Sequence, residues 1–338
     1  MALLVRSASL FGVVEAAQSV GVDPYPILAA CGFTPASLAN PDLRIAAEPY
    51  GRLLESIAVA AGCDDFGLRL AETRELFILG PLGLLLREQN TFGDVLTAVR
   101  RYASLHTEAV DIKMETADGL AVATVEISRI AGMSPLGVRL SLELSIGTIY
   151  RTLRTLLAHR WHPISICFRH DPPASLALHR RFFGCPVEFR HDFSGLVFHE
   201  DDLAMAIPRA DPRMERYVRN YLESLLQNAP TTAVDQVREL AKALLPSGLC
   251  AVERIAKHMH VDYRTIQRRL EREGTSFTEI LNGIRTEMSQ HYLEPNNRSL
   301  SDIAYSLGFS SLSAFSRWFQ TQYGCSPTKW RKGKFARM

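Results

Sequence analysis

The chain has 338 residues, of which 47% are hydrophobic, and a formal net charge of +2 at pH 7. This length predicts two or three domains, and the apolar content excludes an intrinsically disordered chain. The six cysteines are scattered without a Cys-x-x-Cys pair, which fits reduced thiols better than a disulfide framework. No segment approaches the roughly 18 uncharged apolar residues of a membrane helix, so we expect a cytoplasmic protein without membrane contact.

The charge is unevenly distributed along the chain. Residues 250–338 carry 14 Lys and Arg against 8 Asp and Glu, a net charge of +6, which leaves −4 for residues 1–249. A basic segment fused to a mildly acidic one suggests a polyanionic partner for the C-terminal part alone. A chance excess of positive charge on a solvated face is the alternative explanation.

The first part of the chain changes from helical to strand periodicity. Residues 9–101 predict mostly helix, because amphipathic segments alternate there with Gly, Pro and Asp. In residues 108–127, apolar and polar residues alternate on both sides of Asp118-Gly119, a dipeptide favoured in tight hairpin turns. A long helix is predicted next, over residues 137–158.

Three short strand-like segments follow: PISICFRH, PVEFRH and GLVFHE, with a helical SLALHRRFF between the first two. Residues 1–205 therefore predict one α+β domain, with helices and a small, mostly antiparallel sheet. Residues 206–249 predict a helical linker, which ends at the Pro-Ser-Gly of residues 246–248. No strand pattern occurs after residue 250, so residues 250–338 are expected to form an all-α domain.

The C-terminal segment contains an internal duplication. IAKHMHVDYRTIQRRL, residues 255–270, and IAYSLGFSSLSAFSRWF, residues 303–319, share their apolar positions about 48 residues apart. Each copy predicts a helix, a short turn and a second helix, which is the helix-turn-helix arrangement that places a recognition helix in a DNA major groove. The alternative is a helical hairpin in a solvated bundle, with the arginines as ordinary surface charge. Two copies of the pattern in a basic segment argue against this alternative.

In the second copy, the helical pattern is interrupted after Leu307, and this interruption has a physical reason. Gly308 permits the turn, Phe309 fills the angle between the helices, and Ser310 is expected to cap the second helix as Asp262 does in the first copy. Trp318 lies one residue off the exposed face, so we expect it to pack toward a neighbouring helix rather than on a base.

These residues, with GTSFTEILNGIRTEMSQHYL and YGCSPTKWR, closely resemble the DNA-binding domain of AraC/XylS-type bacterial transcription regulators, over about residues 250–333. The resemblance implies seven helices, with a linker helix over about residues 276–293 that holds two helix-turn-helix motifs. One monomer would then reach two successive major grooves of double-stranded DNA.

The resemblance also implies the contact residues. Arginine suits guanine, glutamine suits adenine, and a leucine can touch a thymine methyl group. Base contacts are expected from Arg264, Gln267 and Arg268 in the first motif and from Leu312, Ser313, Ser316 and Arg317 in the second. Phosphate contacts are expected from Ser310, Lys329 and Arg331.

Residues 1–205 resemble the arabinose-binding-type effector domain of the same regulators. The resemblance rests on His170, Pro173, the segment FFGCPV at residues 182–187, and the strand at residues 196–198. It implies a domain that senses a small metabolite, commonly an amino acid, a fatty acid or a related acid, and that can form a homodimer. The sequence itself leaves an amino acid, a fatty acid, a sugar or no effector open. The resemblance also implies a transcription activator that works with RNA polymerase. The sequence does not identify the effector or the residues that bind it.

Two other functions compete with this interpretation: a constitutive DNA-binding protein without a ligand, and an enzyme domain tethered to DNA. Seven of the ten histidines lie between residues 106 and 199, and His159 and His162 have a metal-compatible spacing. No cysteine or carboxylate pattern completes a metal site, and no nucleophile motif such as Gly-x-Ser-x-Gly occurs. We therefore expect no catalytic residues, no metal and no cofactor.

Overall fold

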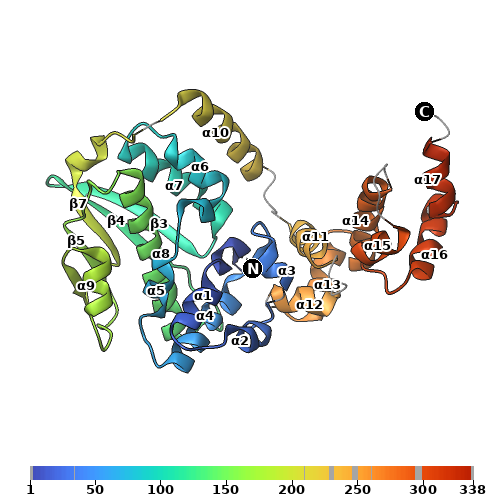
Figure 1. Ribbon diagram of the computed structural model, residues 1–338, viewed down its shortest axis with the longest axis horizontal. Helices are drawn as coiled ribbons and strands as arrows, with labels where there is room; N and C mark the ends of the chain where they lie inside the picture. The colour runs from blue at the N-terminus through green and yellow to red at the C-terminus, as the bar shows by residue number, and fades with distance from the viewer. Residues whose placement is uncertain are drawn as a thin grey trace. The chain divides into compact units, whose positions relative to one another are not determined.

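The chain divides into two units, Met1–Ala229 and Pro230–Met338 (Figure 1). The structure, a computed structural model, describes residues 3–33, 35–208, 210–227, 232–245, 250–259, 261–293 and 299–335. Among these residues, no helix combines the length and the apolar character needed to cross a membrane.

The first unit begins with a mostly helical region, as the amphipathic pattern predicted, and with a short two-stranded sheet that the pattern did not predict. Its elements up to residue 106 are β1 (Leu4–Arg6), the 3₁₀ helix η1 (Ser7–Leu10), α1 (Val13–Ser19), α2 (Pro24–Ala30), α3 (Pro35–Ala39), β2 (Arg44–Ala46), α4 (Ala47–Ala61), α5 (Phe66–Glu72), η2 (Leu76–Leu79), α6 (Pro81–Arg87) and α7 (Phe92–His106). Strands β1 and β2 pair antiparallel.

A five-stranded sheet follows in the order β3-β4-β7-β5-β6. The remaining elements of the unit are β3 (Val110–Ala117), β4 (Leu120–Ile127), α8 (Pro135–Leu156), β5 (Ser165–Phe168), α9 (Ala177–Phe183), β6 (Val187–Phe189), β7 (Gly195–His199), η3 (Glu200–Ala204) and α10 (Pro212–Gln227). Only the β5–β6 pair is parallel among the described strands, so the predicted small, mostly antiparallel sheet is confirmed.

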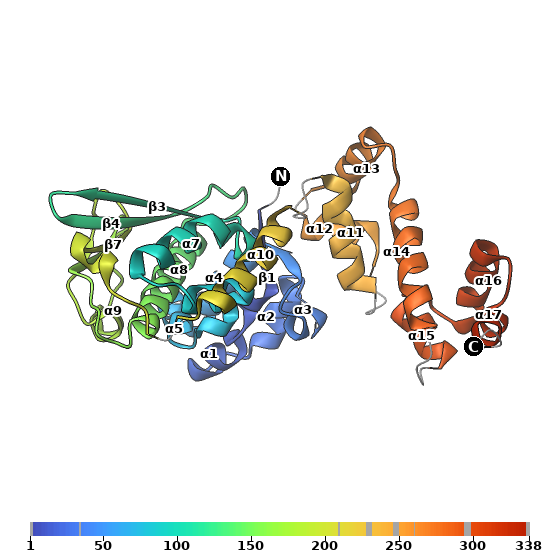
Figure 2. The ribbon, with the colours of Figure 1, turned by 90° about the horizontal axis from the view of Figure 1, so that it is seen from above.

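The predicted hairpin turn between β3 and β4 is also confirmed. Asp118 and Gly119 have φ angles of 52° and 77°, the left-handed pair that a two-residue hairpin turn requires. Strand β4 alternates buried and exposed residues, with Ala121, Ala123 and Val125 buried. Helices α7, α8 and α9 lie on one side of this sheet (Figure 2), so the buried face of β4 turns toward them.

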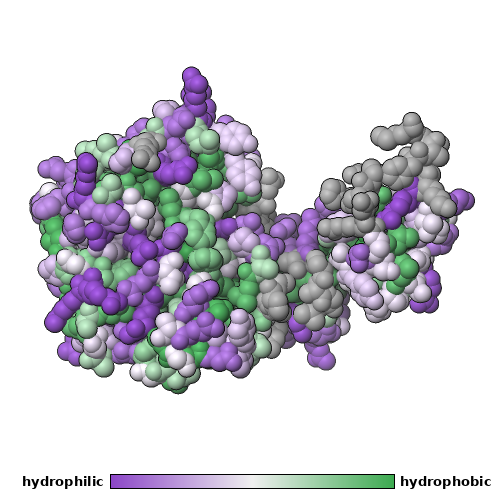
Figure 3. All heavy atoms as spheres, viewed as in Figure 1, coloured by the Kyte–Doolittle hydropathy of each residue, from purple (hydrophilic) through white to green (hydrophobic). Residues whose placement is uncertain are grey.

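Hydrophobic residues reach the surface of the first unit between hydrophilic ones on the face shown in Figure 3. Over the unit as a whole, the exposed aromatic side chains include Phe77, which is 55% exposed, and Tyr217, which is 75% exposed. The largest side chains of the core are instead aromatic and fully enclosed, among them Tyr102, Tyr150, Trp161 and Phe198.

The second unit is all-helical over its described residues. Its seven helices are α11 (Ala233–Leu244), α12 (Val252–His258), α13 (Tyr263–Arg272), α14 (Phe277–Tyr292), α15 (Leu300–Ser306), α16 (Leu312–Tyr323) and α17 (Pro327–Phe335). Within this unit α14 runs between α11 and α13 on one side and α15 to α17 on the other (Figure 2), as expected of a linker helix.

The unit begins earlier than the sequence indicated. Residues 206–249 were expected to form a linker, but α10 belongs to the first unit and α11 to the second. Val237, Leu240 and Leu244 of α11 are at most 2% exposed and share one hydrophobic core with α12 to α16. The apolar face of α11 is therefore covered by the helices that follow it, and α11 supplies the seventh helix.

Candidate nucleic-acid interface and ligand cavity

The first helix-turn-helix consists of α12 and α13. Asp262 is the N-cap of α13, and its carboxylate accepts hydrogen bonds from the Thr265 amide at 2.8 Å and the Thr265 hydroxyl at 2.7 Å. These bonds hold the pKa of Asp262 below its usual range. Ile266 and Leu270 are buried against the core, so the opposite face of α13 is presented to solvent.

The second helix-turn-helix consists of α15 and α16, and here the predicted cap is wrong. Ser311, not Ser310, is the N-cap of α16, and its hydroxyl accepts a hydrogen bond from the Ala314 amide at 3.2 Å. The turn after Leu307 is one residue longer than the turn after Met259 in the first copy. The extra residue therefore lies before the cap and not after it.

Gly308 takes the role expected of it, because its φ angle of 67° lies in the left-handed region. Phe309 packs on Phe315 and Trp318, with ring centroids 5.6 and 5.4 Å apart. The predicted turn residue and the predicted plug are both confirmed.

The predicted base-contacting residues lie on two helix faces, one on α13 and one on α16. Six of the seven are exposed and Ser316 is half-buried; they are Arg264, Gln267 and Arg268 on α13 and Leu312, Ser313, Ser316 and Arg317 on α16. Leu312 is 38% exposed, which leaves its methyl groups available for contact.

The exposed arginines of these faces carry uncompensated charge. The ion pairs among the described residues of the second unit join Arg238 and Lys242 to Glu287. They leave Arg264, Arg268 and Arg317 without a carboxylate partner. Exposed guanidinium groups of this kind are suited to phosphates and to the guanine edge.

The three predicted phosphate contacts differ in exposure. Ser310 is exposed directly before the cap, and Lys329 is exposed in the first turn of α17, where its amide donates to the Ser326 hydroxyl at 3.2 Å. This bond makes Ser326 the cap of α17. Arg331 is half-buried, and two of its guanidinium nitrogens are shielded from solvent.

The linker helix α14 holds the second motif in place. Arg285 donates to the carbonyl oxygens of Leu307 at 3.1 Å and Gly308 at 3.3 Å, and its guanidinium lies 4.0 Å from the centroid of the Phe309 ring. Trp318 donates to the Asn282 side chain of the same helix at 3.0 Å, which confirms the expected packing of Trp318. One cation thus binds both carbonyl oxygens at the end of α15 and the aromatic plug of the turn.

Sequence reasoning missed Arg285. The available signal was a basic residue on the apolar face of α14, between Leu281 and Met288, which both pack against the core. A cation in such a position needs buried acceptors, and the carbonyls at the end of a neighbouring helix supply them.

The first unit contains a cavity of about 150 Å³ that the sequence did not reveal. Strands β3 and β4, helices α7 and α8, and the region around Tyr50 and Arg74 contribute its lining. The lining comes from residues as far apart in the chain as Val5 and Leu153 and is mostly aliphatic. Such a cavity is the default binding site for a small molecule in this unit.

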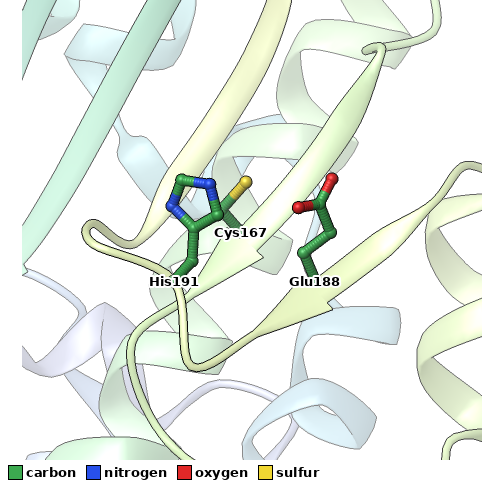
Figure 4. Close-up of side chains that lie close together, drawn as sticks. All are labelled: Cys167, Glu188 and His191. Carbon is green, nitrogen blue, oxygen red and sulfur yellow. The ribbon is translucent and has the colours of Figure 1, made fainter.

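Cys167, Glu188 and His191 lie close together at the β5–β6 edge of the sheet (Figure 4). Their potential ligand atoms are all within 4.8 Å of one another, a donor set that zinc uses. Cys167 and Glu188 are direct partners in the parallel register, so strand pairing accounts for their proximity. Burial raises the pKa of the Cys167 thiol, which disfavours the thiolate that a metal requires.

Comparisons with known proteins agree with this architecture. A family model described as the arabinose-binding domain of AraC transcription regulators, N-terminal, matches residues 21–207, and a helix-turn-helix domain model matches residues 255–333. The chain is 31% identical over 330 residues to the HTH-type transcriptional regulator VirS of Mycobacterium tuberculosis, covering 97% of this chain and 96% of that protein.

Two further relatives come from Pseudomonas aeruginosa. The ornithine utilization regulator is 24% identical over 333 residues, covering 97% of this chain and 96% of that protein. The crystal structure of the transcriptional regulator CdpR has a TM-score of 0.47 and 18% identity, over 91% of this chain and 96% of that one. The two family matches and the similarity to VirS show that the chain belongs to the AraC family of DNA-binding transcriptional regulators, which are not enzymes.

Proposed function

We propose that the second unit reads two successive major grooves of DNA through the exposed faces of α13 and α16. The observation that carries the proposal is the pair of helix faces with unpaired arginines, Arg264 and Arg268 on one and Arg317 on the other. Both helices pack on one shared core, and Arg285 of α14 fixes the turn before the second. A shared core keeps the two faces at a defined spacing, as two half-sites on one DNA molecule require.

A gel-shift titration with the full chain tests this proposal at several salt concentrations. The probes are the promoter fragment that the protein selects from genomic DNA and a scrambled fragment of the same composition. We expect tighter binding to the selected fragment, and for both fragments an affinity that falls steeply with salt. Equal affinity for the two fragments would contradict sequence-specific reading.

We further propose that a small molecule in the cavity of the first unit controls this binding. The cavity is enclosed mostly by the sheet and by helices of that unit, which is where the family places its effector domain. The competing function, constitutive DNA binding without a ligand, predicts that no small molecule raises the unfolding midpoint of the protein. A thermal-shift screen separates the two, because a ligand that binds only the folded state must raise that midpoint.

The family resemblance also supports activation together with RNA polymerase and self-association as a homodimer. In vitro transcription from the selected promoter, with purified polymerase and with or without the protein, measures the first: activation requires more transcript when the protein is added. Sedimentation at several protein concentrations measures the second.

A further inference from the structure

We propose that the effector is a small apolar monocarboxylic acid, with its hydrocarbon chain against the aliphatic cavity lining and its carboxylate paired with Arg74. This inference rests on the proposed regulatory function and names the ligand class of the same cavity. Four observations carry it: the apolar lining, the small number of polar groups in it, the buried cation without a counter-ion, and an unsatisfied histidine.

The lining offers apolar surface that the protein itself does not cover. Four aliphatic side chains of the lining are only half-buried: Val99 of α7, Ile112 of β3, Ile127 of β4 and Ile149 of α8. A ligand that covers these aliphatic side chains removes their surface from water. This burial stabilises the complex by about 25 cal/mol per Å² of apolar surface. The site therefore favours a hydrocarbon group.

Two hydroxyl groups in the lining, on α8, are already bonded within their own helix. Thr148 donates to the Leu144 carbonyl at 2.7 Å, and Ser145 donates to the Ser141 carbonyl at 2.8 Å. These two side chains bond to their own helix, whereas the buried Ser141 hydroxyl, which also lines the cavity, has no hydrogen-bond partner and is one donor that a carboxylate could use. A sugar, which would bury several hydroxyl groups, needs a partner for each of them and is disfavoured by this lining.

Arg74 places a positive charge at the cavity without a counter-ion. Its side chain is 3% exposed and donates to three neutral acceptors: the carbonyls of Ser9 at 2.6 Å and Phe11 at 2.7 Å, and the Tyr50 hydroxyl at 3.0 Å. No Asp or Glu occurs among the described residues that line the cavity. Buried charges are normally paired, so an anionic ligand group would supply the missing partner.

His106 provides a second, independent polar anchor at the cavity. It lines the cavity at the C-terminal end of α7, and its buried Nδ1 atom has no hydrogen-bond partner. Burial, together with Arg6, Arg74 and Arg44, lowers the pKa of His106 to about 3, so the ring is neutral at pH 7. A neutral imidazole can donate one hydrogen bond to a carboxylate oxygen.

The size of the cavity limits the ligand. Its volume of about 150 Å³ resembles that of apolar protein cavities that accept one small aromatic ring. A carboxylic acid of about six to ten carbons is therefore the appropriate probe, and the longest members of this range require some opening of the cavity.

The test measures binding of hexanoate, octanoate and decanoate to the full chain at pH 7 by calorimetry and thermal shift. The corresponding alcohols serve as neutral controls of equal length, and L-arabinose serves as the polar control. We expect at least one carboxylate to raise the unfolding midpoint and to bind at least tenfold tighter than its alcohol, with no shift from L-arabinose. An alcohol that binds as tightly as its acid, a shift from L-arabinose alone, or no binding by any of the acids would overturn the proposal.

Two variants locate the site. Ala103→Phe on α7 places a ring in the cavity and is expected to weaken carboxylate binding at least tenfold, whereas Ser104→Phe on the exposed side of the same helix is expected to leave binding unchanged. Arg74→Gln should bring the affinity for the acid down to that for the alcohol. Because Arg74 also donates hydrogen bonds to two backbone carbonyls and one side chain, the Arg74→Gln variant can fail to fold. In that case the Ala103→Phe variant still tests the proposal.

A separate gel shift, with and without the bound acid, distinguishes this proposal from the regulatory one. Binding of the acid without any change in DNA affinity would contradict the regulatory function but support the ligand class. Sequence-specific DNA binding by a protein that ignores every acid would overturn the ligand class and leave the DNA-reading function standing.

Discussion

Arg317 is exposed on α16 and has no ion-pair partner among the described residues, so its guanidinium is available to a base edge. We expect Arg317→Ala to lower discrimination at one base pair of the site by about 1 to 3 kcal/mol. Competition gel shifts with every single-base variant of the site measure this loss. Lys329→Ala is the comparison, because removal of a phosphate contact should weaken all sequences alike and reduce the salt slope by about one.

His106 should make the stability of the first unit depend on pH. Its pKa of about 3 in the folded protein lies below the ordinary 6.5, so the unfolded chain takes up a proton first as the pH falls. The stabilisation is therefore fully present above pH 6.5 and is lost toward pH 3, by up to about 1.4 kcal/mol per pH unit.

Urea unfolding of the full chain between pH 7.5 and pH 4 measures this dependence. His106→Gln, which has no proton to gain, should flatten the profile below pH 6.5. The exposed His162 offers a control, since His162→Gln should leave the profile unchanged. An equally steep profile for His106→Gln would show that other groups govern acid stability.

At the scale of the element, two adjacent serines before α16 have different roles, because only one of them is the N-cap. The Ser311 hydroxyl satisfies the Ala314 amide, whereas Ser310 is exposed before the helix begins. We expect Ser311→Ala to lower the free energy of unfolding of the second unit by about 1 kcal/mol, and Ser310→Ala to change it by a few tenths at most. Chemical denaturation of the two variants side by side decides between the caps, and the reverse order would place the cap at Ser310.

The turn between α15 and α16 depends on a glycine. A Cβ atom at Gly308 would lie 3.0 Å from the Leu245 carbonyl oxygen, and the φ angle there is 67°. Gly324, after α16, has a φ angle of 70° but no atom within 4 Å of such a Cβ. We expect Gly308→Ala to cost about 2 to 3 kcal/mol and Gly324→Ala about 1 kcal/mol, since only the first adds crowding to backbone strain. Equal costs in denaturation experiments would mean that Leu245 moves aside freely.

Local elements were predictable because their signals are local. The alternation around Asp118-Gly119 and the repeated apolar positions of the two helix-turn-helix motifs both follow from neighbouring residues. The cap at Ser311 was not predictable, since Ser310 and Ser311 can both accept the same hydrogen bond and only the length of the turn selects one. The sequence likewise could not pair Cys167 with Glu188, because their contact depends on the parallel register of β5 and β6.

At the scale of the whole molecule, the chain divides about twenty residues earlier than the Pro-Ser-Gly signal indicated. An amphipathic helix such as α11 reveals that it has an apolar face but not which domain covers that face. The ligand cavity posed the same difficulty, because its lining combines residues from Val5 to Leu153 and exists only after the sheet and helices have packed.

The position of α11 gives a prediction for fragments. A fragment of residues 230–338 should fold cooperatively, whereas a fragment of residues 250–338 should lose most of its helical signal or its cooperative transition. The shorter fragment lacks Val237, Leu240, Ala241 and Leu244. Burial of the valine and of each leucine stabilises the fold by about 1.5 to 3 kcal/mol, and burial of the alanine by less. Circular dichroism and urea unfolding of both fragments test this, and equal stability would remove α11 from the core.

The beginning of α11 is hydrogen-bonded to the end of α13, the first of the two helices proposed to read DNA. The carboxylate of Glu273, the C-cap residue of α13, accepts hydrogen bonds from the Ala233 and Val234 amides, both at 3.0 Å. The start of α11 is therefore tied directly to α13, whereas the turn before α16 is held by Arg285 of α14. In mechanical terms, a force applied at the start of α11 would reach α13 before α16, so the two helices proposed to read DNA are not equivalent.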